Sequence, residues 1–166
     1  MPVRGSLRDG WVALVILAAD RASKAAIEAY TTESLRRTVI PGVAYLVHAH
    51  NPGIAFGLFS EMRSKWVATL LVTVSAGVIV LLAWLLATHR AGGRLSQTGL
   101  ALILGGAAGN LIDRLLRGSV TDFLEVWLGS YHWPAFNVAD SAITVGAVLV
   151  ALELFFGRRH PAGQKA

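Results

Sequence analysis

The sequence contains no cysteine among its 166 residues. Disulfide bonds, metal sites built from thiolates and catalysis by a cysteine nucleophile are therefore excluded. Charged side chains are also scarce: Asp, Glu, Lys and Arg make up 15% of the chain, whereas hydrophobic residues make up 54%. Soluble domains usually carry about 25% charged residues. Together with a mean hydropathy of +0.56, this composition predicts a membrane protein.

One long segment has no charge at all. Residues 66–88 are uncharged, and about 20 apolar residues suffice for a helix that crosses the hydrocarbon core. Weaker apolar segments at 11–30, 96–113 and 136–156 complete a predicted set of four transmembrane helices. Because helices of this length use about half of the chain, we expect a single integral membrane domain over residues 1–166.

The segment 37–60, between the first two predicted helices, differs in composition from the rest. It is rich in Val, Ile, Tyr and Phe and is interrupted by Pro41-Gly42 and Asn51-Pro52-Gly53. Such runs bounded by turn residues predict short strands. The expected fold class is therefore an all-α membrane protein with a small extracytoplasmic β-rich region. The polar residues 157–166 are expected to form a cytoplasmic tail.

Positive charges orient the predicted helices, because cytoplasmic loops carry an excess of Lys and Arg. Such residues precede the first helix, lie between the second and third, and follow the fourth: Arg4, Arg8, Arg90, Arg94, Arg158, Arg159 and Lys165. Both termini are thus expected in the cytoplasm. The net charge of +5 is expected to serve topology, and we expect no nucleic-acid partner.

The first apolar run also fits another interpretation. Two arginines precede residues 11–19, as in a cleaved secretory signal peptide. Apolar residues resume at 25–29, and Asp20 and Lys24 stand four residues apart, as a pair on one helix face would. These features favour a retained first helix.

Polar residues gather at the outer ends of the last two predicted helices. Asn110, Asp113 and Arg114 share one helix face at positions i, i+3 and i+4, and Asn137 and Asp140 stand three residues apart. The two helices run in opposite directions, so both groups can converge at one depth. Asp122, in the link predicted to be a loop, can fold back to the same place. Two carboxylates in a partly dry pocket share a proton, which supplies a general acid and a general base.

Each of these residues also has a structural interpretation. Asp113 can form an ion pair with the adjacent Arg114, and Asp140 in the first turn of a helix can act as a cap. Asp20 and Lys24 can neutralise each other inside the membrane.

Two further patterns do not predict a functional site. Gly105 and Gly109 form a small-xxx-small pattern that predicts close packing against a neighbouring helix. His48, His50 and His132 lack the close helical spacing of a zinc site such as H-E-x-x-H, so no metal site is predicted from them.

Five sequence blocks together resemble the bacterial lipoprotein signal peptidases, also called signal peptidase II. Arg21 stands where that family more often has Gln, and the remaining blocks follow the family pattern in the same order. The blocks are Asp20-Arg21-Ala22-Ser23-Lys24, Asn51-Pro52-Gly53-Ile54-Ala55-Phe56-Gly57, Gly105-Gly106-Ala107-Ala108-Gly109-Asn110-Leu111-Ile112-Asp113-Arg114, Gly118-Ser119-Val120-Thr121-Asp122-Phe123 and Phe136-Asn137-Val138-Ala139-Asp140.

The resemblance implies an aspartic endopeptidase in the bacterial inner membrane, with its active site at the outer leaflet. Its substrate would be a prolipoprotein, cleaved just before a diacylglyceryl-modified cysteine, with acyl chains held in lipid. The catalytic pair falls on Asp122 and Asp140, and no cofactor or metal is expected. The supporting polar residues fall on Asp20, Lys24, Asn51, Gly53, Asn110, Asp113, Arg114 and Asn137.

Two other classes of protein remain open from the residues alone. A small transporter or proton-relay protein would also place Asp and Lys in membrane helices, but distributed through the membrane depth. A metal-dependent lipid transferase would place acidic residues close together on one helix face.

Overall fold

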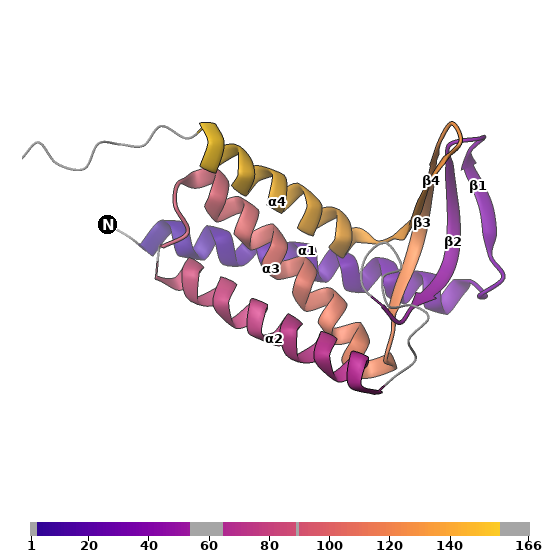
Figure 1. Ribbon diagram of the computed structural model, residues 1–166, viewed down its shortest axis with the longest axis horizontal. Coiled ribbons are helices and arrows are strands. Elements are labelled where there is room, and N and C mark those ends of the chain that lie inside the picture. The colour runs from indigo at the N-terminus through magenta and orange to yellow at the C-terminus, as the bar shows by residue number, and fades with distance from the viewer. Residues whose placement is uncertain (1–2, 54–64, 89, 157–166) are drawn as a thin grey trace, which may run out of the picture.

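The computed structural model describes residues 3–53, 65–88 and 90–156. Within this part of the chain, four helices form a bundle, and an antiparallel sheet of four strands lies at one end of it (Figure 1). The elements in chain order are α1 (Val3–Tyr30), β1 (Arg36–Ile40), β2 (Ala44–Asn51), α2 (Lys65–Ala87), α3 (Arg94–Arg117), β3 (Val120–Leu128), β4 (Tyr131–Phe136) and α4 (Val138–Phe156).

The helices lie close to where the sequence predicts them, with two differences. Helix α1 begins at Val3, not at residue 11, and α3 continues to Arg117, not 113. The extension of α3 places Asp113 and Arg114 inside the helix, which ends where Gly118 adopts a left-handed conformation with φ of 75°. The expected tail 157–166 and the end of the predicted β-rich segment lie outside the described residues.

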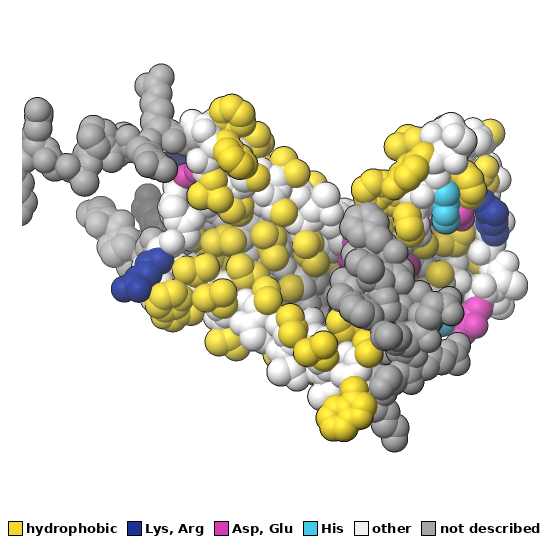
Figure 2. Space-filling model, in the orientation of Figure 1, with side chains coloured by type: hydrophobic (Ala, Val, Ile, Leu, Met, Phe, Trp, Pro, Cys, Tyr) yellow, Lys and Arg dark blue, Asp and Glu magenta, His cyan; other side chains and the backbone are white. Residues whose placement is uncertain are grey.

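Three of the described helices, α2, α3 and α4, are long and apolar enough to cross a membrane. Helix α1 is not in this set, since its second half carries charged residues such as Asp20 and Lys24. Large side chains on the outer faces of the bundle, including Leu70 and Val148, are more than half exposed. Figure 2 shows such hydrophobic side chains spread over the displayed face of the bundle. These are surfaces that lipid would cover.

Helix α3 packs against the other three helices, and its glycines lie at the contacts with α1 and α4, as the small-xxx-small pattern predicts. Gly105 lies against the backbone carbonyl of Ala13 in α1, and Gly106 against that of Ala139 in α4. A side chain at either position would collide with backbone, so these glycines permit the close approach of α1 and α4. The site described below is held between these three helices.

The sheet confirms the predicted strands between the first two helices but corrects the rest of the predicted fold class. The sequence predicts strands only between the first two helices, but β3 and β4 come from the link between α3 and α4. The strand order is β1-β2-β3-β4, and β2 pairs with β3 so that Ala49 lies opposite Asp122. Asp122 therefore lies on a strand and not in a loop, and the protein is a helical bundle with a sheet, not an all-α protein.

Candidate active site

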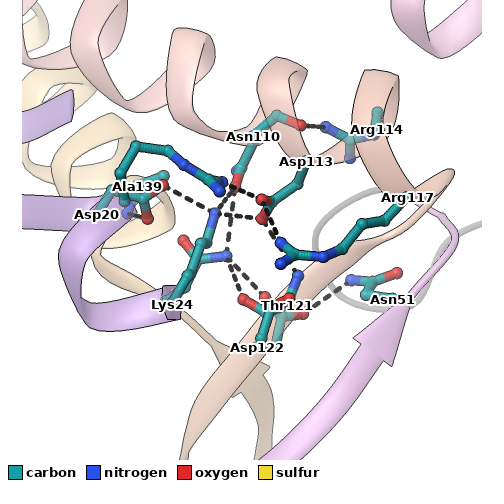
Figure 3. Close-up of polar contacts among 12 residues, drawn as sticks. Asp20, Lys24, Asn51, Asn110, Asp113, Arg114, Arg117, Thr121, Asp122 and Ala139 are labelled. Atoms are coloured by element: carbon teal, nitrogen blue, oxygen red, sulfur yellow. Dashed lines mark hydrogen bonds and ion pairs between the residues drawn. The ribbon is translucent and has the colours of Figure 1, made fainter. Parts of the chain in front are cut away.

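A buried cluster of charges joins α1 to α3 (Figure 3). The ammonium of Lys24 forms ion pairs of 2.9 Å with both Asp20 and Asp113, and it donates a hydrogen bond of 2.8 Å to Oδ1 of Asn110. The side chains of Lys24, Asp20 and Asp113 have no solvent exposure. All three donors of the ammonium thus face oxygen atoms, as burial of a charge requires. The predicted pairing of Asp20 with Lys24 is confirmed.

The prediction that Asp113 forms an ion pair with Arg114 is wrong. Asp113 is bonded instead to Arg21 through Oδ1 and to Lys24 through Oδ2, and Oδ2 also lies 3.4 Å from the backbone N of Thr121. Neighbouring residues on a helix point about 100° apart, so adjacency in sequence does not bring Asp113 and Arg114 together. Arg21, the residue at which the sequence departs from the family pattern, therefore reaches Asp113.

Arg114 makes different contacts. Its Nη2 donates a hydrogen bond of 2.9 Å to the carbonyl of Gly53, and its Nη1 donates to the carbonyl of Asn110 at 3.4 Å. Arg114 thus ties α3 to the turn that follows β2. Asn51, the last residue of β2, holds this turn as well, because its Oδ1 accepts a hydrogen bond of 2.9 Å from the backbone N of Gly53.

Asp122 is a buried carboxylate bonded to two amides. It is 2% exposed. Asn51 donates from Nδ2 to its Oδ2 at 3.1 Å, and Asn137 donates from Nδ2 to its Oδ1 at 2.7 Å. Burial, together with the nearby carboxylate of Asp140, raises the pKa of Asp122 to about 7, while the two hydrogen bonds act in the opposite direction. Asp122 can therefore exchange a proton near neutral pH.

Asp140 lies in the first turn of α4, where it forms a reciprocal cap with Asn137. The backbone N of Asp140 donates to Oδ1 of Asn137 at 2.9 Å, and the backbone N of Asn137 lies 3.3 Å from Oδ2 of Asp140. This is the geometry of a capping box. The other oxygen, Oδ1, accepts a hydrogen bond of 2.9 Å from Nδ2 of Asn110. Asp140 thus caps its helix and still presents a carboxylate to the site.

Two asparagines connect the charge cluster to the pair of aspartates. Because Lys24 donates to Oδ1 of Asn110, the NH₂ group of that amide must face Asp140. Asn137 bonds to Asp122 through its side chain and to Asp140 through side chain and backbone. The two carboxylates are therefore positioned by the same residue.

Asp20 also contacts the start of α4. Oδ1 of Asp20 accepts a hydrogen bond of 3.0 Å from the backbone N of Ala139, an otherwise unpaired donor in the first turn of this helix. Gly109 leaves the space that the carboxylate of Asp20 occupies. The charge cluster therefore fixes the position of the helix that carries Asp140.

An apolar cavity of about 500 Å³ adjoins Asp140, between α3, α4 and β4. Asp140, Asn110 and Arg114 stand in its wall, and most of the remaining lining is hydrophobic. Lining residues include Trp133, Phe136 and Ile143. A cavity of this size with a few convergent polar groups is typical of a ligand site.

The structure brings all ten residues predicted for the site into this region. Sequence reasoning missed Thr121, whose backbone carbonyl accepts a hydrogen bond of 3.3 Å from Nδ2 of Asn137, and Arg117, whose Nη1 lies 3.5 Å from Asp113. Arg117 follows Asp113 at i+4, a spacing that could have revealed it. Of the outer histidines, His132 lies on β4 and is paired with Glu125 at 2.9 Å.

These features define a class of protein: a membrane protein in which one asparagine holds two carboxylates beside an apolar cavity. The sequence profile described as signal peptidase (SPase) II matches residues 12–156. The chain belongs to this family.

Individual relatives agree with the family assignment. The chain is 42% identical to the lipoprotein signal peptidase of Solibacter usitatus, with 91% of this chain and 92% of that protein covered. It is also 42% identical to that of Desulforapulum autotrophicum, with 95% and 98% covered. A solved bacterial membrane enzyme has the same fold, with a TM-score of 0.81 at 24% identity over 98% of this chain and 96% of its own.

Proposed function

We propose that this protein removes the signal peptides of prolipoproteins as an aspartic endopeptidase, with Asp122 and Asp140 as the catalytic pair. The bond is cut just before a diacylglyceryl-modified cysteine. One observation carries the proposal: Asn137 positions both carboxylates, and Asp140 stands in the wall of an apolar cavity. Membership of the signal peptidase II family supplies the substrate class.

The mechanism needs one proton shared between the two aspartates. Two carboxylates near each other in a buried site do not both ionise at neutral pH. The ionised partner takes a proton from a water molecule, and the resulting hydroxide attacks the scissile carbonyl. The protonated partner donates a hydrogen bond to the oxyanion and then a proton to the leaving nitrogen. The chemistry requires no cofactor.

The other polar residues position this pair. Asn51, Asn110 and Asn137 hold the carboxylate oxygens by neutral hydrogen bonds, which permits either aspartate to take up a proton. Asp20, Lys24 and Asp113 hold α1, α3 and α4 together behind them. Gly53 and Arg114 tie the turn after β2 to α3.

The placement in the membrane follows from the same arrangement. We propose one integral membrane domain with four spanning helices in the bacterial inner membrane. The start of α1, the α2–α3 link and the end of α4 lie at the end of the bundle opposite the sheet (Figure 1). The excess of positive residues in these segments supports a cytoplasmic location for both termini. The catalytic pair then lies at the outer leaflet, where acyl chains of a substrate can remain in lipid.

The decisive experiment is cleavage of a synthetic prolipoprotein by the purified protein in detergent. The lipidated precursor should be cut immediately before its modified cysteine, and the same precursor without lipid should be cut far more slowly. Equal turnover of the two would remove the lipid from the mechanism. Cleavage at another position would contradict the proposed specificity.

A further inference from the structure

Three side chains with metal-binding atoms meet at the junction of α1 and the sheet. Glu28 lies in the last turns of α1, and His48 and His50 lie on β2. One ligand atom from each side chain can be chosen so that all three lie within 4.8 Å of one another. The rings of His48 and His50 have centroids 5.1 Å apart. No residue of this cluster has a role in the proposed peptidase mechanism.

The cluster lies on the face of the sheet opposite to Asp122. Ala49 lies opposite Asp122 in the β2–β3 pair, and His50 lies opposite Thr121. Successive side chains on a strand point to opposite faces, and directly opposed residues share a face. His50 and Thr121 therefore point away from the face that carries Asp122. The bond between Thr121 and Glu28 is consistent with this placement.

The proton of His48 is fixed by its neighbour. The hydroxyl of Thr31 has one hydrogen and donates it to the carbonyl of Ile27 at 2.7 Å. The same oxygen lies 2.9 Å from Nδ1 of His48, so it accepts the hydrogen bond and Nδ1 carries the proton. Nε2 of His48 therefore presents a lone pair, as in metal-binding histidines whose other nitrogen donates to the protein.

That lone pair has no partner among the described residues. His48 is 7% exposed, and its Nε2 is buried without a hydrogen bond. A buried polar atom without a partner costs about 1–3 kcal/mol, so such atoms usually have a partner such as water or an ion. The neighbouring ligand atoms of Glu28 and His50 identify a cation as the missing partner.

The surrounding charges permit a cation there. The carboxylate of Glu28 supplies negative charge, and the C-terminal end of α1 adds the negative end of the helix dipole. Oε1 of Glu33 lies 3.4 Å from Nε2 of His50 and can supply an oxygen as a fourth ligand. Nη2 of Arg117 lies 3.5 Å from Oε2 of Glu28, which opposes a cation but leaves further lone pairs on the carboxylate.

We propose that Glu28, His48 and His50 form a binding site for one Zn²⁺ ion that fastens α1 to the sheet. Two imidazoles and a carboxylate suit zinc, which binds such ligands at roughly 2.0–2.2 Å, with water or a fourth side chain completing a tetrahedron. Ligand atoms in that geometry lie roughly 3.3 Å apart. Side-chain rotation of the exposed His50 closes the remaining distance.

The test uses the full chain, purified in detergent without a histidine tag and stripped with a chelator. Addition of Zn²⁺ should raise the melting temperature by on the order of 5 °C, because a ligand that binds only the folded state stabilises it. Mg²⁺ at the same concentration should have no effect. After removal of excess metal, about one Zn²⁺ should remain per chain.

Matched variants assign the site. His50→Gln and Glu28→Gln should abolish the zinc-induced shift, and His132→Gln, which removes a histidine from the same sheet, should retain it. His50 is exposed, so its variant tests the site even where His48→Gln fails to fold. An equal zinc shift in His50→Gln and the unmodified protein would overturn the proposal, as would no bound zinc in the latter.

Discussion

Two groups of carboxylates lie side by side in this protein and are neutralised in different ways. Asp20 and Asp113 are paired with the ammonium of Lys24. Asp122 and Asp140 receive their hydrogen bonds mainly from asparagine amides, with no ion pair to either in the described part of the chain. A cation in contact fixes a carboxylate in its ionised form, whereas a neutral amide permits it to bind a proton. The first group is suited to structure and the second to proton transfer.

The largest effect is expected from Asp122→Asn and Asp140→Asn. Asparagine has a similar shape but cannot transfer a proton, so the cleavage rate should fall by about 10²–10⁴ or more. The melting temperature should not fall in parallel, since neither carboxylate forms an ion pair among the described residues. Cleavage rate and thermal stability are measured on the same preparations. Substantial turnover by either variant would falsify the assignment of the catalytic pair.

Lys24→Met should affect mainly stability. The substitution leaves Asp20 and Asp113 buried without their shared cation, and breaking a buried ion pair costs about 3–5 kcal/mol. The free energy of unfolding or the melting temperature in detergent measures this loss. Asp122→Asn serves as the control from the other group. If Lys24→Met proved as stable as that control while losing activity, Lys24 would belong to the catalytic group.

The pH dependence of stability should report Asp122. Its pKa is about 7 in the folded protein, above the ordinary value of 3.8. A raised pKa means that the folded state binds the proton more tightly, so this contribution is complete below about pH 4 and is lost as pH rises through 7. Relative to the unmodified protein, Asp122→Asn should therefore gain stability between pH 4 and 8, by at most about 4 kcal/mol.

That gain is measured as the difference in melting temperature between the two proteins across the pH range. A difference that stays constant from pH 4 to 8 would show that Asp122 does not titrate in this interval. The cleavage rate should also decrease above pH 7, because ionisation of both aspartates removes the general acid.

Gly109→Ala should weaken the contact by which Asp20 holds the helix that carries Asp140. A methyl group there would occupy the position of the Asp20 carboxylate, which also accepts the hydrogen bond from the backbone N of Ala139. Overpacking of this kind costs about 1–3 kcal/mol. Because Asp20 holds the start of α4, the cleavage rate should fall as well. Gly77→Ala, at a helical position with open space, is the matched control and should lower neither stability nor cleavage rate.

The smallest effect is expected from Arg21→Gln, which introduces the residue that the family more often has at this position. Arg21 is 26% exposed, and Asp113 keeps its ion pair with Lys24 when the guanidinium is removed. The loss of stability should be about 1 kcal/mol or less. Thermal melts at low and high salt measure it. A loss as large as that of Lys24→Met would show that the exposed cation, not the buried one, neutralises Asp113.

Short-range patterns in the sequence predicted part of the site. The i, i+4 spacing predicted the pair of Asp20 with Lys24, and the i, i+3 spacing placed Asn137 and Asp140 together at the start of α4. The same reasoning was wrong for Asp113 and Arg114, because residues adjacent on a helix point in different directions. Spacing along one helix determines which side chains share a face, but it does not determine what lies opposite that face.

The sequence by itself determined that this is a membrane protein with four helices, because hydrophobicity and helix periodicity depend only on the order of residues. Only the tertiary structure decided that Asp122 lies on a strand, that β3 pairs with β2 to form one sheet, and that Lys24 lies between Asp20 and Asp113. These arrangements depend on contacts between residues far apart in the chain. Their energies arise from burial and from distances between atoms, which exist only once the helices have packed.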